Sequence, residues 1–163
     1  MLIPLLIIVL FLLPVFWVLK TISPWSSPEE ILDKFYKTDA VEDCIADILI
    51  LNKQKMLPVI CEKIKDKNMS RRRYAIYFLG NEKYPKAKEA LLQILSDETE
   101  KDYFRSDALE ALYMIDKTEG KKCAEKYRGQ TGYLEHLSES ILKNEPISAP
   151  NRTFFDALFS VHE

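Results

Sequence analysis

The sequence contains little glycine, little histidine and no large excess of either charge. Four glycines among 163 residues argue against a turn-rich β-sandwich and, with 29% charged residues, favour a helical chain. The net charge of −2 leaves no overall basic field of the kind that nucleic-acid-binding domains carry, so nucleic acid is not an expected partner. His136 and His162 lie far apart and make no visible nucleophile–base pair or metal site. We therefore expect no catalytic residue, metal or cofactor.

Cysteine is scarce as well. Cys44, Cys61 and Cys123 are odd in number, show no CxxC spacing and lie in apolar helical patterns. These features favour buried, reduced thiols over a disulfide framework, in keeping with a reducing compartment.

Charge is absent altogether from the first nineteen residues, MLIPLLIIVLFLLPVFWVL. As a helix rising about 1.5 Å per residue, this run would reach about 28 Å, close to the hydrocarbon thickness of a bilayer. A cleaved secretory signal is the alternative, but no basic residue precedes the run and KTISPWSS is a poor cleavage site. We therefore expect a single-pass transmembrane anchor at 1–19. Lys20, Lys34 and Lys37 follow it, and the positive-inside rule then favours a domain that faces the cytoplasm.

After a linker at 20–27, the chain is a succession of helical patterns. Ser27 is the expected N-cap of the first helix, with Pro28 at its first position. No strand pattern is present, and apolar residues recur at i, i+3, i+4 and i+7. The predicted helices cover 28–38, 40–52, 54–67, 70–80, 84–96, 102–116, 118–128 and 131–143. The predicted fold class is all-α, with one helical domain at 28–143, followed by a Pro-containing linker and a C-terminal amphipathic helix within 144–163.

The helical segments resemble one another at a nearly constant offset. ALLQILSD (90–97) is similar to VICEKIKD (59–66), 31 residues earlier. Four further pairs are 33 residues apart: Arg72/Arg105, Ala75/Ala108, Phe78/Ala111 and Leu79/Leu112. Such recurrence is expected of helix pairs that each bury one face against the next pair. It predicts a short α-solenoid.

These segments resemble the HEAT-repeat family, in particular the short HEAT-like repeats named after the phycobilisome lyases. The resemblance is carried by RRYAIYFLG (72–80), AKEALLQILSD (87–97) and RSDALEALYMI (105–115). It implies an all-helical repeat fold that binds other proteins on the surface between stacked helices. It also implies that Arg72 and Arg105 are structural, each bonding to a carboxylate or carbonyl of a neighbouring repeat.

Basic residues gather around the three consecutive arginines, because segment 53–73 holds eight Lys or Arg and only two acids. At about 100° per residue, Arg71, Arg72 and Arg73 cannot share one narrow helix face, and a solvated or salt-bridged surface would explain them. The alternative is a set of contacts to an anion or a partner, for example an anionic membrane surface. The candidates for such contacts are Arg71, Arg73, Lys63 and Lys67.

The C-terminal segment is interrupted by two prolines in EPISAP and continues as TFFDALFSVHE. In a helix, its apolar side chains would cluster on one side: Phe154, Phe155, Leu158 and Phe159. We expect this helix to cap an open end of the solenoid, or else to dock onto a membrane surface or into a partner's groove.

Together these patterns predict a membrane-tethered scaffold or adaptor that binds an unidentified protein partner and has no catalytic activity. The first alternative is a HEAT-like enzyme or enzyme accessory, such as a lyase-like modifier. The second is a binder of anionic membrane surfaces through 53–73. An enzyme would require a pocket in which ionisable groups with perturbed pKa values converge.

Overall fold

The computed structural model describes residues 26–40, 45–130, 132–145 and 147. These residues form helices and contain no strand, which confirms the all-α prediction for the described part of the chain. The helices are α2 (Pro28–Lys37), α3 (Asp47–Leu51), α4 (Lys53–Lys63), α5 (Arg72–Asn81), α6 (Lys88–Ser96), α7 (Asp102–Ile115), α8 (Lys117–Tyr127) and α9 (Tyr133–Lys143), with a 3-10 turn, η2 (Pro85–Ala87), before α6.

Local side-chain chemistry sets several helix ends. The Ser27 hydroxyl accepts the backbone N–H of Glu30 at 3.2 Å, and the Glu30 carboxylate accepts the backbone N–H of Ser27, which together make a capping box ahead of Pro28. Asp116 caps α8 in a similar way by accepting the N–H groups of Thr118 and Glu119, both at 3.1 Å. These ends depend only on neighbouring residues.

Several predicted helices extend beyond the observed ones, among them 40–52, 54–67 and 84–96, of which residues 85–87 form η2 instead. The prediction over 40–52 is wrong at its start, because α3 begins at Asp47, and the N–H of Ala40 bonds to the Thr38 hydroxyl. The prediction over 54–67 is wrong at its end, because α4 stops at Lys63. Asp66 then accepts the backbone N–H of Asn68 at 2.9 Å, a local bond that competes with helix.

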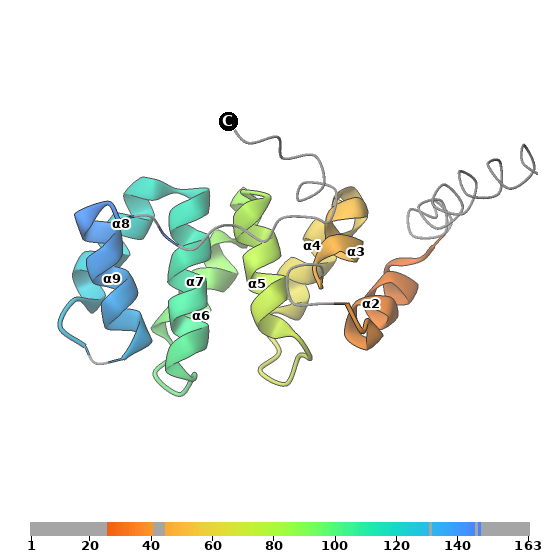
Figure 1. The fold of residues 1–163 in the computed structure, drawn as a ribbon, viewed down its shortest axis with the longest axis horizontal. Helices are drawn as coiled ribbons and strands as arrows, with labels where there is room; N and C mark the ends of the chain where they lie inside the picture. Colours follow the sequence, from red (N-terminus) through yellow and green to blue (C-terminus); the bar gives the residue numbers. More distant parts are fainter. Residues whose placement is uncertain (1–25, 41–44, 131, 146, 148–163) are drawn as a thin grey trace, which may run out of the picture.

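The helices lie side by side in chain order along the long axis of the molecule, from α2 at one end to α9 at the other (Figure 1). The central helix α7 contacts α5, α6, α8 and α9, so its main neighbours are the helices one and two positions away in the sequence. α5, α7 and α9 form one row, and α6 and α8 pack behind it. The buried apolar side chains of all these helices form one continuous cluster.

Two glycines let helices approach closely. A Cβ added at Gly80 would lie 2.8 Å from the Cα of Ala111 in α7, and one at Gly120 would lie 2.5 Å from the Cα of Tyr113. Tyr113 stands 33 residues after Gly80, where the repeat pattern would have glycine. Where Tyr113 of α7 contacts α8, the small residue is instead Gly120 of α8. The contacts α5–α7 and α7–α8 therefore each depend on one glycine.

No helix among the described residues is long and apolar enough to cross a bilayer. The predicted anchor at 1–19 lies outside the described residues, as do Cys44, His162 and the predicted C-terminal helix with Phe154, Phe155, Leu158 and Phe159. Those predictions remain predictions.

Candidate functional site

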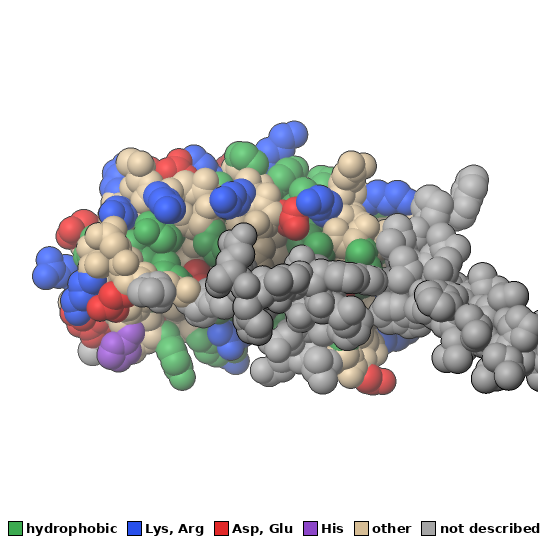
Figure 2. Space-filling view, turned by 45° about the horizontal axis from the view of Figure 1, so that its top comes forward, with side chains coloured by type: hydrophobic (Ala, Val, Ile, Leu, Met, Phe, Trp, Pro, Cys, Tyr) green, Lys and Arg blue, Asp and Glu red, His purple; other side chains and the backbone are tan. Residues whose placement is uncertain are grey.

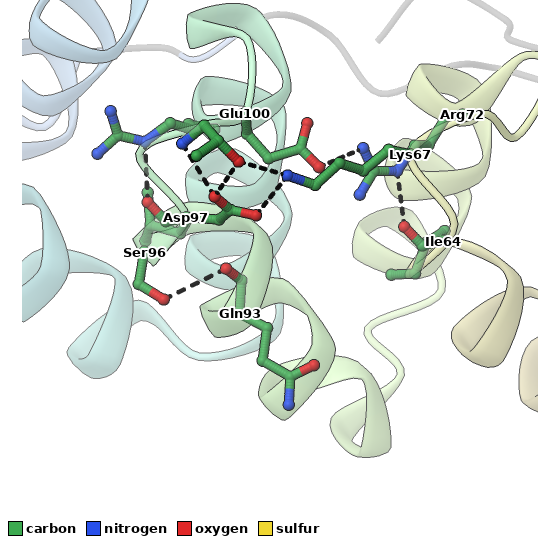
Figure 3. A network of polar contacts seen from close by, with 10 residues as sticks. Ile64, Lys67, Arg72, Gln93, Ser96, Asp97 and Glu100 are labelled. Carbon is green, nitrogen blue, oxygen red and sulfur yellow. Dashed lines mark hydrogen bonds and ion pairs between the residues drawn. The ribbon is translucent and has the colours of Figure 1, made fainter.

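Arg72 is the largest fully buried side chain among the described residues, with 2% of its surface exposed. Its Nε donates to the carbonyl of Ile64 at 2.6 Å, and its Nη1 pairs with Oε1 of Glu100 at 2.7 Å (Figure 3). The guanidinium also lies 4.9 Å from the ring centroid of Phe104. Arg72 thus joins the residue after α4 to the loop before α7, and its charge is compensated inside the protein.

Arg105, which lies 33 residues after Arg72, makes a related contact. Its Nε donates to the carbonyl of Leu95 at 3.0 Å, and its guanidinium lies 5.3 Å from the ring centroid of Tyr127. Ile64 and Leu95, which supply the two carbonyls, are themselves 31 residues apart. Both arginines therefore connect neighbouring helices, while their assignment to HEAT-like repeats stays a prediction.

The basic cluster at 53–73 is largely paired with acids from elsewhere in the chain. Five of its eight cations form ion pairs among the described residues, and four of the five acids lie outside the segment: Lys53–Glu82, Lys65–Glu62, Lys67–Asp97, Arg72–Glu100 and Arg73–Asp107. Counting only acids within 53–73 therefore overestimates the charge that the segment presents to solvent.

The four candidate anion contacts point to different places. Lys67 binds the Asp97 carboxylate and the Thr99 hydroxyl, both at 2.6 Å, and this pairing lowers the pKa of Asp97 well below its usual range (Figure 3). Arg71 donates to the carbonyl of Thr38, beyond the end of α2. Arg73 turns toward α7, and Lys63 is exposed on the last turn of α4. The structure does not gather them into one site.

A concave surface lies along α5, α7 and α9. Its larger hollow, of about 640 Å³, is lined by Arg73, Tyr77, Tyr103, Ser106, Asp107, Glu110, Tyr133, His136, Leu137 and Ser140. A second hollow, of about 260 Å³, lies toward the other end of the same helices and is lined by Lys83, Glu110, Tyr113, Met114, Lys117, Glu145 and Ile147. Glu110 lines both hollows, and we call the two together the α7 groove.

One side of the α7 groove is a closed polar network. Arg73 binds Asp107 through two bonds, Nε to Oδ2 at 2.8 Å and Nη2 to Oδ1 at 3.1 Å, and the Tyr77 hydroxyl donates to Oδ1 at 2.8 Å. The Asp107 bond raises the pKa of Arg73, and burial raises the pKa of Tyr77. At neutral pH the guanidinium of Arg73 and the phenol of Tyr77 therefore both keep their protons.

Glu110 lies three residues after Asp107 and has a different environment. It is 6% exposed, its carboxyl lies within hydrogen-bonding reach of Tyr77, and it forms no ion pair with a described residue. Burial raises its pKa to about 7, helped by the charge of Asp107 and opposed by Tyr77 and Arg73. Near neutral pH, Glu110 is therefore a buried acid that changes between neutral and charged forms.

The pH dependence of stability should reveal this acid. Because its pKa is raised from 4.5 to about 7 in the folded state, Glu110 stabilises the fold at low pH, and that contribution is lost as the pH rises through 7. Glu110→Gln removes the titration, so the wild type should lose up to about 3 kcal/mol relative to the variant between about pH 5 and about pH 8. Thermal unfolding of both chains, followed by circular dichroism, measures the difference, and parallel pH profiles would contradict it.

The residues of this network were not predicted from the sequence. Tyr77, Asp107 and Glu110 sit within helical patterns where acids and tyrosines read as ordinary surface residues. The available signal was the spacing of Asp107 and Glu110, which puts two acids on one side of α7 beside buried apolar positions. Arg73, in contrast, was predicted as a candidate contact, and the structure places it in the α7 groove.

Metal and thiol chemistry find little support in the described residues. They contain no group of three or more His, Cys, Asp or Glu side chains arranged to hold a metal ion. His136 lines the α7 groove, while Cys61 and Cys123 are buried, which raises the pKa of each thiol and keeps it protonated.

No protein-family model, curated protein or solved structure matches this chain. The resemblance to HEAT-like repeats carried by the arginine motif therefore stays a prediction.

Proposed function

We propose that this chain is a membrane-tethered scaffold that binds a partner protein in the α7 groove. In this proposal, residues 1–19 anchor the chain, the helical domain faces the cytoplasm, and the helices form a short α-solenoid of HEAT-like pairs. The observation that carries the proposal is a groove that runs along three successive helices of one row and is lined by four tyrosines.

The arrangement of the helices supports a solenoid. Each of the helices α5 to α8 packs mainly against neighbours one or two positions away, and the row of α5, α7 and α9 advances along one direction (Figure 1). The bonds of Arg72 and Arg105 to carbonyls after α4 and in α6, buried for Arg72 and half-buried for Arg105, are contacts that would recur from repeat to repeat.

The side chains of the α7 groove suit a protein ligand. Tyr133 is 69% exposed and is the one large hydrophobic side chain that is strongly exposed among the described residues. Tyr77 and Tyr103 line the same hollow. Tyrosine is enriched at the centres of protein interfaces, since its ring buries a large area while its hydroxyl still forms hydrogen bonds.

Binding to an anionic membrane surface through 53–73 is less favoured. Lys67, Arg72 and Arg73 already pair with carboxylates. Lysine and arginine side chains are spaced along the face seen in Figure 2 with acidic side chains among them, so they form no single basic patch there.

An enzymatic role has one observation in its favour, which is that Glu110 has a pKa near 7 in a groove that also contains His136. The Ser140 hydroxyl of the groove donates to the Glu145 carboxylate at 3.0 Å, but this contact is exposed to solvent, and Asp107 is already held by Arg73 and Tyr77. A scaffold is therefore the better supported proposal.

Site-specific cross-linking tests the proposal. A photo-reactive amino acid at position 133 should form a discrete adduct with a partner protein in membranes, and Tyr133→Ala in an otherwise equal chain should weaken capture of that partner at least about fivefold. Position 93 in α6, which is also exposed, is the matched control on the other row. Equal adducts from positions 93 and 133, or none from 133, would contradict a partner in the α7 groove.

A further inference from the structure

The carboxyl of Glu110 is buried, lines both hollows of the α7 groove and has no cation bound to it among the described residues. Lys83 and Lys117 line the smaller hollow, yet neither forms an ion pair with Glu110. The charged and titratable side chains around the groove are Arg73, Tyr77 and Lys83 from α5 and its end, Tyr103, Asp107 and Tyr113 from α7, Lys117 from α8, and Tyr133, His136 and Glu145 from α9 and its end. A buried carboxylate is costly unless it is paired.

The same groove shows how it holds a guanidinium. The Arg73 side chain binds Asp107 through two parallel bonds and lies 5.9 Å from the ring centroid of Tyr77 and 5.6 Å from that of Tyr103. A carboxylate with neighbouring tyrosine rings therefore forms one occupied cation site. Glu110, one helical turn further along α7, offers the groove a second carboxylate, with Tyr113 beside it in the smaller hollow.

We infer that Glu110 is the counter-ion of a subsite that receives the guanidinium group of an arginine side chain from the partner protein. The inference rests on the proposed function, and it specifies the chemistry of the segment that enters the α7 groove. A metal ion fits less well, because no third metal-ligating side chain converges there within the described residues. The planar guanidinium matches both the carboxylate and the aromatic walls, as Arg73 does next to it.

Proton linkage supplies a direct readout. A cation that binds only the ionised form of Glu110 must lower the pKa of that carboxyl, which stands at about 7 without it. At ten times its dissociation constant, such a ligand lowers the apparent pKa by about one unit. Affinity for the cation should accordingly fall as the pH drops below 7.

The experiment uses the full chain in detergent micelles with ¹³C-labelled glutamate carboxyls, and Glu110→Gln identifies the Glu110 signal by its disappearance. Ethylguanidinium is the probe, and ethylurea, which has a similar planar shape and no charge, is its matched control. Sodium chloride at equal concentration controls for screening. We expect ethylguanidinium at ten times its dissociation constant to lower the Glu110 pKa by about one unit, while ethylurea and salt leave it within a few tenths.

Three results are distinguishable. A Glu110 pKa that ethylguanidinium leaves unchanged, both in the wild type and in Arg152→Gln, overturns the subsite, even if position 133 still cross-links to a partner. A lowered pKa without a cross-link from position 133 overturns only the partner. Arg152→Gln tests a guanidinium of the chain itself as a competitor, since Arg152 lies outside the described residues. If the Glu110 signal responds to the probe only after Arg152→Gln, the chain itself fills the subsite and the assignment to a partner is wrong.

Discussion

Replacing Arg72 with methionine should lower the free energy of unfolding by about 3–5 kcal/mol, the largest effect expected of any single change. Methionine keeps much of the apolar volume beside Phe104 but removes the bonds to the Ile64 carbonyl and to Glu100. The Glu100 side chain is only 5% exposed, so its charge would be left buried without a cation. Thermal or urea unfolding of the wild type and the variant measures the loss.

Two further variants separate charge from packing. Adding Glu100→Gln to Arg72→Met removes the stranded charge, so the double variant should be more stable than Arg72→Met alone. Arg105→Met is the matched control, since Arg105 bonds to the Leu95 carbonyl at a half-buried position, and it should cost only about 1–2 kcal/mol. A double variant no more stable than Arg72→Met would mean that Arg72 acts by packing and not by its charge.

Gly120→Ala should destabilise the chain by about 1–3 kcal/mol although alanine is the better helix former. In an open helix this exchange would stabilise by up to about 1 kcal/mol. Here the new methyl group would lie 2.5 Å from the Cα of Tyr113, so α7 and α8 must move apart. The sign of the change in the free energy of unfolding therefore shows whether helix propensity or helix packing dominates at position 120.

Lys122→Ala is the control in the same helix. Its side chain is 78% exposed and makes only a long ion pair with Glu119 at 3.8 Å, so a change within about 0.5 kcal/mol is expected. If Gly120→Ala were as stable as the wild type or more stable, the close approach of α7 and α8 would not hold in solution.

Much of the helical organisation could be predicted from the sequence. Ser27 and Pro28 mark the start of α2, and the periodic apolar residues locate α5 through α9 to within a few residues, because both signals act between neighbours one or two turns apart. The error at the end of the 54–67 prediction arose where the short polar side chain of Asp66 bonds to the backbone after α4.

The candidate site could be predicted only in small part. Arg73 stood out as a basic residue, but its partner Asp107 is 34 residues away, and only the packing of α5 against α7 brings the two together. Lys67 and Asp97 are likewise joined by the meeting of two loops. The sequence alone therefore could not show that the cations of 53–73 are already paired.

The sequence by itself determined that the described chain is helical, where most of those helices lie, and which of their faces are apolar, because helix formation and amphipathicity are short-range properties. The tertiary structure alone decided which charges neutralise each other and which acid is left without a cation. Burial, charge pairing and the pKa of Glu110 depend on distances between side chains from different helices, and those distances exist only after the helices have packed.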